Sequence, residues 1–345
     1  MKLIVAISMG FTGLVTYLLS GLGPAFEIEL KNGGSFGVTE VRWGEKLEKY
    51  TANIMAPVCE EGICYNVNVT FNWNLIGEFI DYQVQPYDPL TKNDHKPFTL
   101  ADYAKLQNIL TNHDLIFTGM KAEELIVETA EADVDGYSGA TIEAIKDEVI
   151  EGALFTCHTL WHIANGAVVD SIRNHTRGRL DKHLIGKIIK YNTPSAHYYL
   201  INNLSDKQFD QNLPEIIDLV RQGKGYLPKN TIEKIPERLF GGKEIQDFLT
   251  QNYDSLSYYT QVAALDKLQK VPLQNKLAEK LLTEISGRNS AQNQKIITLI
   301  IKNNDVDCIQ KLMDLLIEKK IRLSEPNYRL LQELKVDRME VVEKI

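Results

Sequence analysis

The sequence predicts an α+β domain followed by an all-α domain, and two patterns along its 345 residues support this fold class. Residues 26–190 begin with alternating apolar and polar positions, typical of strands, and continue with helical periodicity. Residues 191–345 show short helical patterns separated by polar or glycine-containing connections. A content of 44% hydrophobic and 24% charged residues is that of a folded chain long enough for two ordinary domains.

The charge is unevenly distributed between the two predicted domains. Residues 1–190 carry 16 Lys and Arg against 25 Asp and Glu, whereas residues 191–345 carry 22 against 21. A nucleic-acid-binding protein needs a basic surface that displaces counterions from phosphates. Neither part offers such an excess of basic residues, so the composition argues against nucleic acid as a partner.

The N-terminal residues 1–25 predict a signal peptide or an uncleaved membrane anchor, because residues 3–26 carry no charged side chain. Gly23 and Ala25 are small residues at the two positions that cleavage after Ala25 requires. Export would place the protein outside the cytoplasm, either periplasmic or anchored to the membrane. Four hydroxyl residues interrupt the apolar stretch, so the alternative is a buried strand or helix of a cytoplasmic fold.

The four cysteines form two groups. Cys59 and Cys64 lie in Cys-Glu-Glu-Gly-Ile-Cys, close enough for a small disulfide loop in an oxidising compartment. A redox-active pair or half of a metal site is the alternative, which the spacing does not favour. Cys157 and Cys308 lie on apolar helical faces and are expected to be buried thiols.

A hairpin and a capped helix are predicted in the first domain. Residues 65–71 alternate between apolar and polar, and residues 79–84 form the returning strand, with Gly77 in the connection. Thr99 can cap a helix, whose apolar face carries Tyr103, Leu106, Ile109 and Leu110.

The segment that follows combines a glycine-containing turn with helical periodicity. Asp135-Gly-Tyr-Ser-Gly-Ala-Thr141 precedes apolar residues at helical spacing from Ile142 to Ala164, and Asn165-Gly166 predicts a left-handed helix end. Unpaired N–H groups and the positive end of the helix dipole favour a phosphate at such a turn. The alternative is that Ser138 only caps the helix and that Gly139 only permits the turn.

This segment resembles the Asp-x-x-Ser/Thr-Gly-Ala-Thr/Ser motif of the bacterial FMN-binding domain family, found in flavinylated subunits of sodium-pumping quinone reductases and related electron-transport complexes. The resemblance covers about residues 60–170, and the predicted hairpin looks like the strand–glycine–strand unit that opens such domains. It implies that a flavin transferase attaches FMN to Thr141 through a phosphoester outside the cytoplasm. The implied cofactor site consists of Asp135, Ser138, Gly139, Ala140 and Thr141.

Three side chains of the following helix are further candidates. His158 and His162 are four residues apart and share one helix face, so they could chelate a metal if a third ligand such as His95 came near. Such pairs also arise by chance, and we predict no metal site. Trp161 could stack on the flavin ring, with a place in the core as the alternative.

The second predicted domain contains helix pairs with a spacing of roughly 35 residues, as in a HEAT-like α-solenoid, and a plain helical bundle is the alternative. Its helical patterns cover residues 213–220, 231–240, 258–268, 273–285, 294–301 and 306–317.

Sequence motifs of several enzyme classes are absent, so the chain is not assigned to an enzyme class. It contains no P-loop, dinucleotide-binding fingerprint, Gly-x-Ser-x-Gly or His-Glu-x-x-His. The expected function is that of an exported flavoprotein that transfers electrons between a membrane or envelope redox partner and an acceptor. The alternatives are reversible FMN binding, or a flavin-free envelope scaffold that docks a partner through its helical domain.

Overall fold

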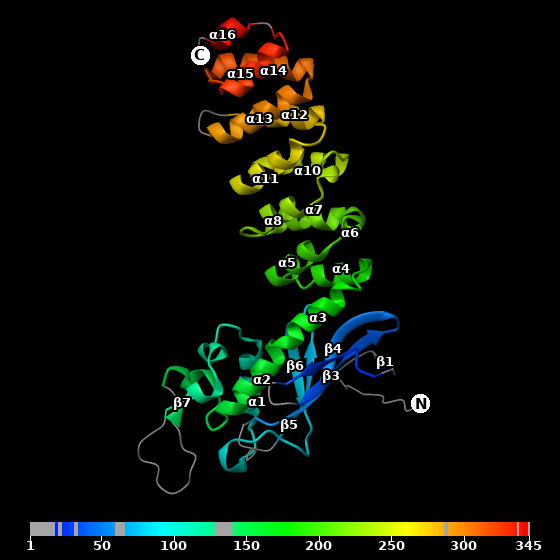
Figure 1. The fold of residues 1–345 in the computed structure, drawn as a ribbon, viewed down its shortest axis with the longest axis vertical. Helices are drawn as coiled ribbons and strands as arrows, with labels where there is room; N and C mark the ends of the chain where they lie inside the picture. Colours follow the sequence, from blue (N-terminus) through cyan, green and yellow to red (C-terminus); the bar gives the residue numbers. More distant parts are fainter. Residues whose placement is uncertain are drawn as a thin grey trace. The chain divides into compact units, whose positions relative to one another are not determined.

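The computed structural model describes two compact units, Met1–Leu184 (unit 1) and Ile185–Ile345 (unit 2). The domain boundary predicted from the sequence lies at residue 190. The element order is a set of strands followed by many helices, which is the α+β and then all-α layout that the sequence predicts (Figure 1). The described residues are 18–19, 23–30, 34–58, 66–127, 140–141, 143–285, 289–336 and 338–343.

Unit 1 contains an antiparallel sheet with the strand order β1-β3-β4-β5-β6, and β2 also pairs with β3. Alternate residues of the long central strands are buried, as expected for a sheet with one face against a core. The strands are β1 (Leu18–Leu19), β2 (Phe26–Glu29), β3 (Ser35–Trp43), β4 (Lys46–Ala56), β5 (Val67–Trp73) and β6 (Phe79–Val84).

The predicted hairpin is confirmed as β5 and β6, although β5 continues to Trp73. Asn74 organises the turn, because its side-chain oxygen accepts the N–H groups of Ile76 and Glu78 at 3.0 and 2.9 Å. Gly77 has a φ of +80°, and a Cβ atom there would lie 2.9 Å from the backbone of Val169. Glycine is therefore required both by the turn and by the close approach of this backbone.

Three helices of unit 1 are α1 (Leu100–Thr111), α2 (Leu154–Asn165) and α3 (Ala167–Arg177). Thr99 and Asp102 form a capping box at the start of α1, which confirms the predicted helix. Trp73 fixes α2 to the sheet, because its buried indole N–H donates to the Ala164 carbonyl at 2.8 Å. The short 3-10 helices are η1 (Asn93–His95), η2 (Ile116–Gly119), η3 (Ala122–Leu125) and η4 (Glu143–Glu148).

The continuous helix predicted from Ile142 to Ala164 is wrong. Residues 143–148 form η4, and Gly152 then adopts a φ of +73° while its carbonyl accepts the Asn93 N–H at 2.7 Å. Because of this tertiary contact, the helical backbone does not continue through Gly152, and α2 begins only at Leu154. The predicted left-handed end at Gly166 is also wrong, since its φ is −89° and α3 follows directly.

A nearly buried carboxylate joins the sheet of unit 1 to α3. Glu40 on β3 is 8% exposed, and its oxygens lie 2.7 Å from His175 Nε2, 2.6 Å from an Arg42 nitrogen and 3.3 Å from Arg179 Nε. Burial alone would raise the pKa of Glu40, but the hydrogen bonds from His175 and Arg42 outweigh it and lower the pKa. Glu40 is therefore held as an anion by two arginines and the hydrogen-bonded imidazole of His175.

Unit 2 consists of helices in two rows, and α4 crosses the boundary between the units. The helices of one row, α4, α7, α10, α12 and α14, begin at residues 182, 213, 243, 275 and 306, a spacing of 30–32 residues rather than the predicted 35. The bounds are α4 (Lys182–Ile189), α5 (Pro194–Asn203), α6 (Asp206–Gln211), α7 (Leu213–Gln222), α8 (Leu227–Lys234), α9 (Glu237–Phe240), α10 (Lys243–Asn252), α11 (Tyr258–Leu268), α12 (Asn275–Glu284), α13 (Ser290–Asn303), α14 (Val306–Lys319), α15 (Glu325–Glu333) and α16 (Met339–Glu343). A further 3-10 helix, η5 (Tyr253–Ser255), follows α10.

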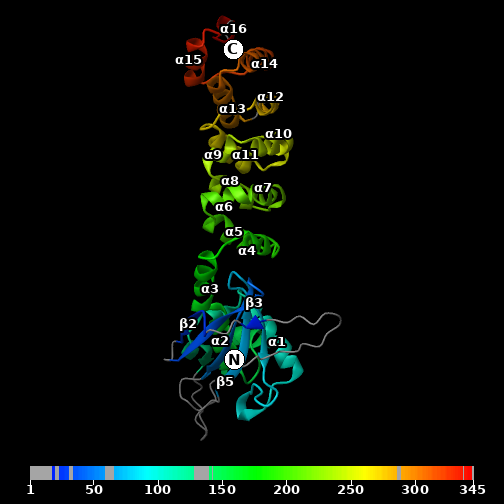
Figure 2. The same cartoon turned by 90° about the vertical axis from the view of Figure 1, so that its right-hand side faces the viewer.

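Contacts in unit 2 run from each helix pair to the next. Helices α5, α8, α11, α13 and α15 form the second row, and each contacts the following member. The pairs α7 with α8, α10 with α11 and α12 with α13 lie in successive layers in both views (Figures 1 and 2). The chain therefore buries its apolar faces between sequence neighbours.

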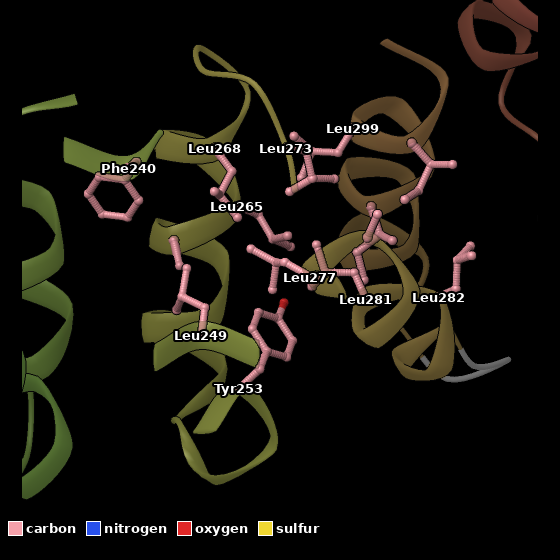
Figure 3. Packing of buried hydrophobic residues seen from close by; sticks show 14 of the residues in the cluster. Phe240, Leu249, Tyr253, Leu265, Leu268, Leu273, Leu277, Leu281, Leu282 and Leu299 are labelled. Carbon is pink, nitrogen blue, oxygen red and sulfur yellow. The ribbon is translucent and has the colours of Figure 1, made fainter. Parts of the chain in front are cut away.

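The core of unit 2 is aliphatic and continuous between these layers. Side chains of α10, α11 and α12 point toward one another, among them Leu249, Leu265 and Leu281, and Tyr253 fills the space beside them (Figure 3). Buried amides link the layers: the Gln246 side-chain N–H groups donate to the carbonyls of Phe240 and Pro272, both at 2.8 Å. In the part of the chain that is described, no helix is long and apolar enough to cross a membrane.

Candidate functional site

Of the predicted cofactor motif, the structure describes only the last two residues, Ala140 and Thr141. Ala140 and Thr141 form β8, whose backbone pairs with β7 (Ile126–Val127) in the register Val127 to Ala140 and Ile126 to Thr141. The end of the motif is thus part of a short antiparallel pair followed by η4, whereas the sequence placed it at the mouth of a long helix. The predicted site residues Asp135, Ser138 and Gly139, and the predicted disulfide partners Cys59 and Cys64, lie outside the described residues.

Of the elements that flank the β7–β8 pair in the chain, one contacts α2 directly and one contacts α2 through η2. The 3-10 helix η3 leads directly into β7 and contacts α2, while η4 contacts η2, which itself contacts α2. Glu148 fixes η4 to η2, because its carboxylate accepts the backbone N–H groups of Ile116 and Phe117 at 2.8 and 3.4 Å. Lys105 of α1 reaches the same segment by donating to the Val149 carbonyl.

Aromatic rings and imidazoles gather on this side of α2. The indole N–H of Trp161 donates to the Asn112 carbonyl at 2.8 Å, which fixes the ring against the turn after α1. The rings of His113, Phe117 and His162 meet Trp161 edge-on, with centroid distances of 6.3, 6.4 and 5.1 Å. Trp161 is half-buried, so part of its surface remains reachable from solvent.

His158 and His162 approach each other closely. Their Nε2 atoms are 3.0 Å apart, their ring centroids are 4.3 Å apart, and both side chains are half-buried. His158 Nε2 also lies 3.0 Å from the Met120 carbonyl oxygen. The two imidazoles are therefore hydrogen-bonded to each other on one face of α2.

The third ligand considered for these histidines does not join them. Among the described residues, no three His, Cys, Asp or Glu side chains lie close enough to share a metal ion. His95 lies in η1, beside the segment that contacts Gly152 rather than beside η2.

Cys157, one helical turn before Trp161 on α2, is buried as predicted. Burial raises the pKa of its thiol to about 11, and its sulfur accepts the Ile150 N–H at 3.5 Å. A thiol in this environment is protonated at neutral pH and is a poor nucleophile. The half-buried side chains of Trp161, His158 and His162, rather than this thiol, are therefore the candidates for contact with a ligand.

The sequence correctly predicts that Trp161, His158 and His162 lie on one side of a helix, because positions three and four apart share a helix face. It missed His113, Phe117 and Met120, which belong to the loop and 3-10 turns after α1. Nothing in the periodicity of these residues indicates that they fold back onto α2.

Comparison with known proteins found no match for this chain. No protein-family model matches the chain, and no significant match was found among the curated proteins or the solved structures.

Proposed function

We propose that this chain is an exported flavoprotein that carries FMN at Thr141 and transfers electrons at the cell envelope. The observation that carries this proposal is the segment Asp135-Gly-Tyr-Ser-Gly-Ala-Thr141, in which every fixed position of the FMN-attachment motif is present. The uncharged N-terminal residues 3–26 support export to the compartment in which such attachment takes place. Electrons would come from a redox partner in the membrane or envelope.

Half-buried aromatic and imidazole side chains of α2 support the proposal that a flavin ring binds near Thr141. The backbone of Thr141 is paired with Ile126; η3, which leads into β7, contacts α2, and η4, which follows β8, contacts η2. A flavin attached there would have Trp161 as its stacking partner and His158 and His162 as neighbouring polar groups. FMN supplies the redox chemistry, while these side chains orient the ring and tune its environment.

The proposal is tested by co-expressing the full chain with a flavin transferase in a host that exports it. We expect the flavin absorbance to remain with the polypeptide after denaturation and the intact mass to increase by one FMN phosphoester. Thr141→Ala should abolish this mass, whereas Thr111→Ala, a threonine exposed on α1, should retain it.

Two other outcomes separate the alternatives. Colour that is present in the native protein and lost on denaturation, also in Thr141→Ala, would show reversible binding in place of covalent attachment. A colourless chain in both states would contradict the flavoprotein proposal.

The second candidate function is a flavin-free envelope scaffold whose HEAT-like helical unit docks a partner. A specific observation favours it: Tyr226, Tyr258 and Tyr259 are 64%, 42% and 57% exposed, although tyrosine is a large and partly apolar side chain. Their rings contact one another across two successive repeats, with centroid distances of 6.1 Å for Tyr226–Tyr259 and 5.6 Å for Tyr258–Tyr259. Rigid tyrosine clusters are enriched at protein interfaces.

A photo-crosslinking side chain at position 259, expressed in the source organism, tests the scaffold. We expect one defined partner that is lost when Tyr226 and Tyr258 are both changed to Ala. A crosslinker at Tyr87, an exposed tyrosine of unit 1, should not capture it. Identical products from both positions would contradict docking at the tyrosine cluster.

A further inference from the structure

The connections between the two helices of each pair in unit 2 carry mostly positive charge. They are residues 190–193, 223–226, 253–257, 285–289 and 320–324, and in a stack of helix pairs such connections follow one another along one edge, here called the connection edge. Their one acidic residue is Asp254, and their basic residues are Lys190, Lys224, Arg288, Lys320 and Arg322. The connection edge is therefore basic, although the whole chain has a net charge of −8.

The positive charge of this edge is not neutralised within the described part of the chain. Asp254 is paired with Lys280 at 2.8 Å. Four basic side chains of the edge are exposed, and none of them forms a hydrogen bond or ion pair with another described residue: Lys190, Lys224, Lys320 and Arg322. On the opposite edge, where one helix pair leads to the next, charges of both signs occur and form ion pairs, as Arg238 does with Asp210. An anionic partner is therefore attracted to the connection edge rather than to the opposite one.

The exposed tyrosine cluster lies on the same edge. Tyr226 is the last residue of the connection that contains Lys224, and Tyr258 and Tyr259 begin α11 directly after the next connection. The three rings contact one another, and their hydroxyl groups form no hydrogen bond with another described residue. Each hydroxyl can donate to a carboxylate, and each ring face can contact an apolar side chain. The cluster thus offers both polar and apolar contacts beside an unpaired cation.

We propose that the connection edge around Lys224 and the tyrosine cluster binds an acidic, extended segment of a partner protein. This inference rests on the second candidate function, docking by the helical unit, and it names the chemistry of the partner. The carboxylates of the segment accept hydrogen bonds from the Lys224 ammonium and the tyrosine hydroxyls, while its apolar side chains pack on the rings. Nucleic acid fits this edge less well, because the cations are distributed over four connections rather than gathered into one patch that matches adjacent phosphates.

Fluorescence anisotropy with the full chain tests this proposal. The probe is a fluorescein-labelled peptide in which Glu and Leu alternate, and the comparison probes are a peptide in which Lys and Leu alternate and an oligothymidylate. We expect the acidic peptide to bind better than either comparison probe and to bind more weakly as the salt concentration is raised. Absence of binding, or equal binding of the basic peptide, would overturn the proposal. Tighter binding of the oligothymidylate would overturn the choice of a protein partner.

Single substitutions locate the binding of the acidic peptide. Lys224→Gln should weaken it by about two- to fivefold, and Tyr226→Ala by at least about fivefold. Lys243→Gln is the matched control for charge, because Lys243 is also exposed and unpaired among the described residues but begins α10 on the opposite edge. Tyr87→Ala, which removes an exposed tyrosine of unit 1, is the control for the ring. Unchanged affinity in Lys224→Gln, or equal weakening in either control, would overturn binding at this edge.

The outcome can be separated from that of the crosslinking experiment at position 259. A crosslinked partner together with no binding of the acidic peptide would leave docking in place and overturn the acidic partner. Peptide binding that Lys224→Gln weakens, without a crosslinked partner, would support recognition of acidic segments at this edge while contradicting docking in the source organism. No flavin is involved, so neither result depends on the Thr141 experiment.

Discussion

The two units of this chain are held together over different sequence distances. In unit 1, the polar links that fix the helices to the sheet join residues that are far apart: Glu40 and His175 are separated by 135 residues, and Tyr50 and Thr176 by 126. In unit 2, the buried amide links span about one repeat, as between Gln246 and Pro272, 26 residues apart, and between Gln292 and Gln261, 31 apart. Unit 1 therefore depends on closing long loops, whereas unit 2 is stabilised repeat by repeat.

This difference predicts how far the loss of structure caused by a local change should extend within each unit. Damage to the sheet–helix contacts should affect the whole of unit 1, because every element depends on the same long-range closure. Damage to one repeat should remain near that repeat. All three tryptophans, Trp43, Trp73 and Trp161, lie in unit 1, so their fluorescence reports the unfolding of this unit.

The largest loss of stability is expected for Trp73→Ala. The Trp73 side chain is fully buried against α2 and its indole N–H is hydrogen-bonded, so truncation leaves a cavity and an unsatisfied carbonyl at Ala164. The free energy of unfolding of unit 1 should fall by about 3–5 kcal/mol, measured by urea titration with fluorescence from the remaining tryptophans. Trp43→Ala is the control: Trp43 is 48% exposed, so this substitution should lower the free energy of unfolding far less. Equal losses for both variants would contradict a core centred on Trp73.

Glu40→Gln should have the next largest effect. It removes the anion that pairs with His175, Arg42 and Arg179, and we expect a loss of about 2–3 kcal/mol from unit 1 at neutral pH. Arg42 and Arg179 keep access to water, with side chains 28% and 46% exposed, which limits the loss. Glu45→Gln changes an exposed acid in the turn between β3 and β4 and should leave the fluorescence-detected transition unchanged.

The same carboxylate gives a pH dependence of known sign. The pKa of Glu40 in the folded protein lies below its ordinary value of 4.5, so its stabilising effect is complete above that value and is lost as pH falls through the folded pKa. The stability difference between the unchanged protein and Glu40→Gln should therefore shrink as the pH is lowered below about 4.5. Urea titrations between pH 7 and pH 3 would measure it, and a difference that stays constant or grows would refute this assignment.

Features that neighbouring residues encode were predictable from the sequence. The hairpin of β5 and β6 follows from alternation over residues 65–71, and the start of α1 follows from Thr99 and Asp102. The burial of Cys157 and the shared face of His158 and His162 follow from helical periodicity. In each of these cases the signal and the structure lie within a few residues of each other.

Features that depend on distant partners were not predictable. The break before α2 arises because the Gly152 carbonyl meets the N–H of Asn93, about sixty residues away along the chain. The cluster around Glu40 and the position of Met120 beside His158 likewise need the folded sheet and turns. In unit 2, the predicted patterns correspond to α7, α8 with α9, and α11 to α14, whereas α5, α6, α10, α15 and α16 were not predicted. The spacing was overestimated, because the repeats share burial patterns rather than residues.

A change within one repeat tests the local character of unit 2. Gln246 is 1% exposed, its side chain donates to the Phe240 and Pro272 carbonyls, and it accepts the Gln274 N–H. Gln246→Leu leaves these backbone groups unpaired and should cost about 1–3 kcal/mol. Hydrogen exchange should show the lost protection in residues 240–285 and none in unit 1. Gln251→Leu, an exposed glutamine of the same helix, is the control, and loss of protection throughout unit 2 would show that its repeats unfold together.

The smallest loss of stability is expected for Arg238→Gln. Arg238 forms a bidentate ion pair with Asp210 in the preceding repeat, and similar exposed pairs join Lys295 to Asp266 and Lys311 to Glu279. These pairs repeat at about the spacing of the helices, so they could be mistaken for the links that hold the layers together. Exposed ion pairs are screened by salt and oppose side-chain entropy, so the melting temperature of Arg238→Gln should match that of the unchanged protein at high salt and differ little at low salt. A loss as large as that of Gln246→Leu would mean that surface charge, rather than the buried amides and leucines, holds one repeat to the next.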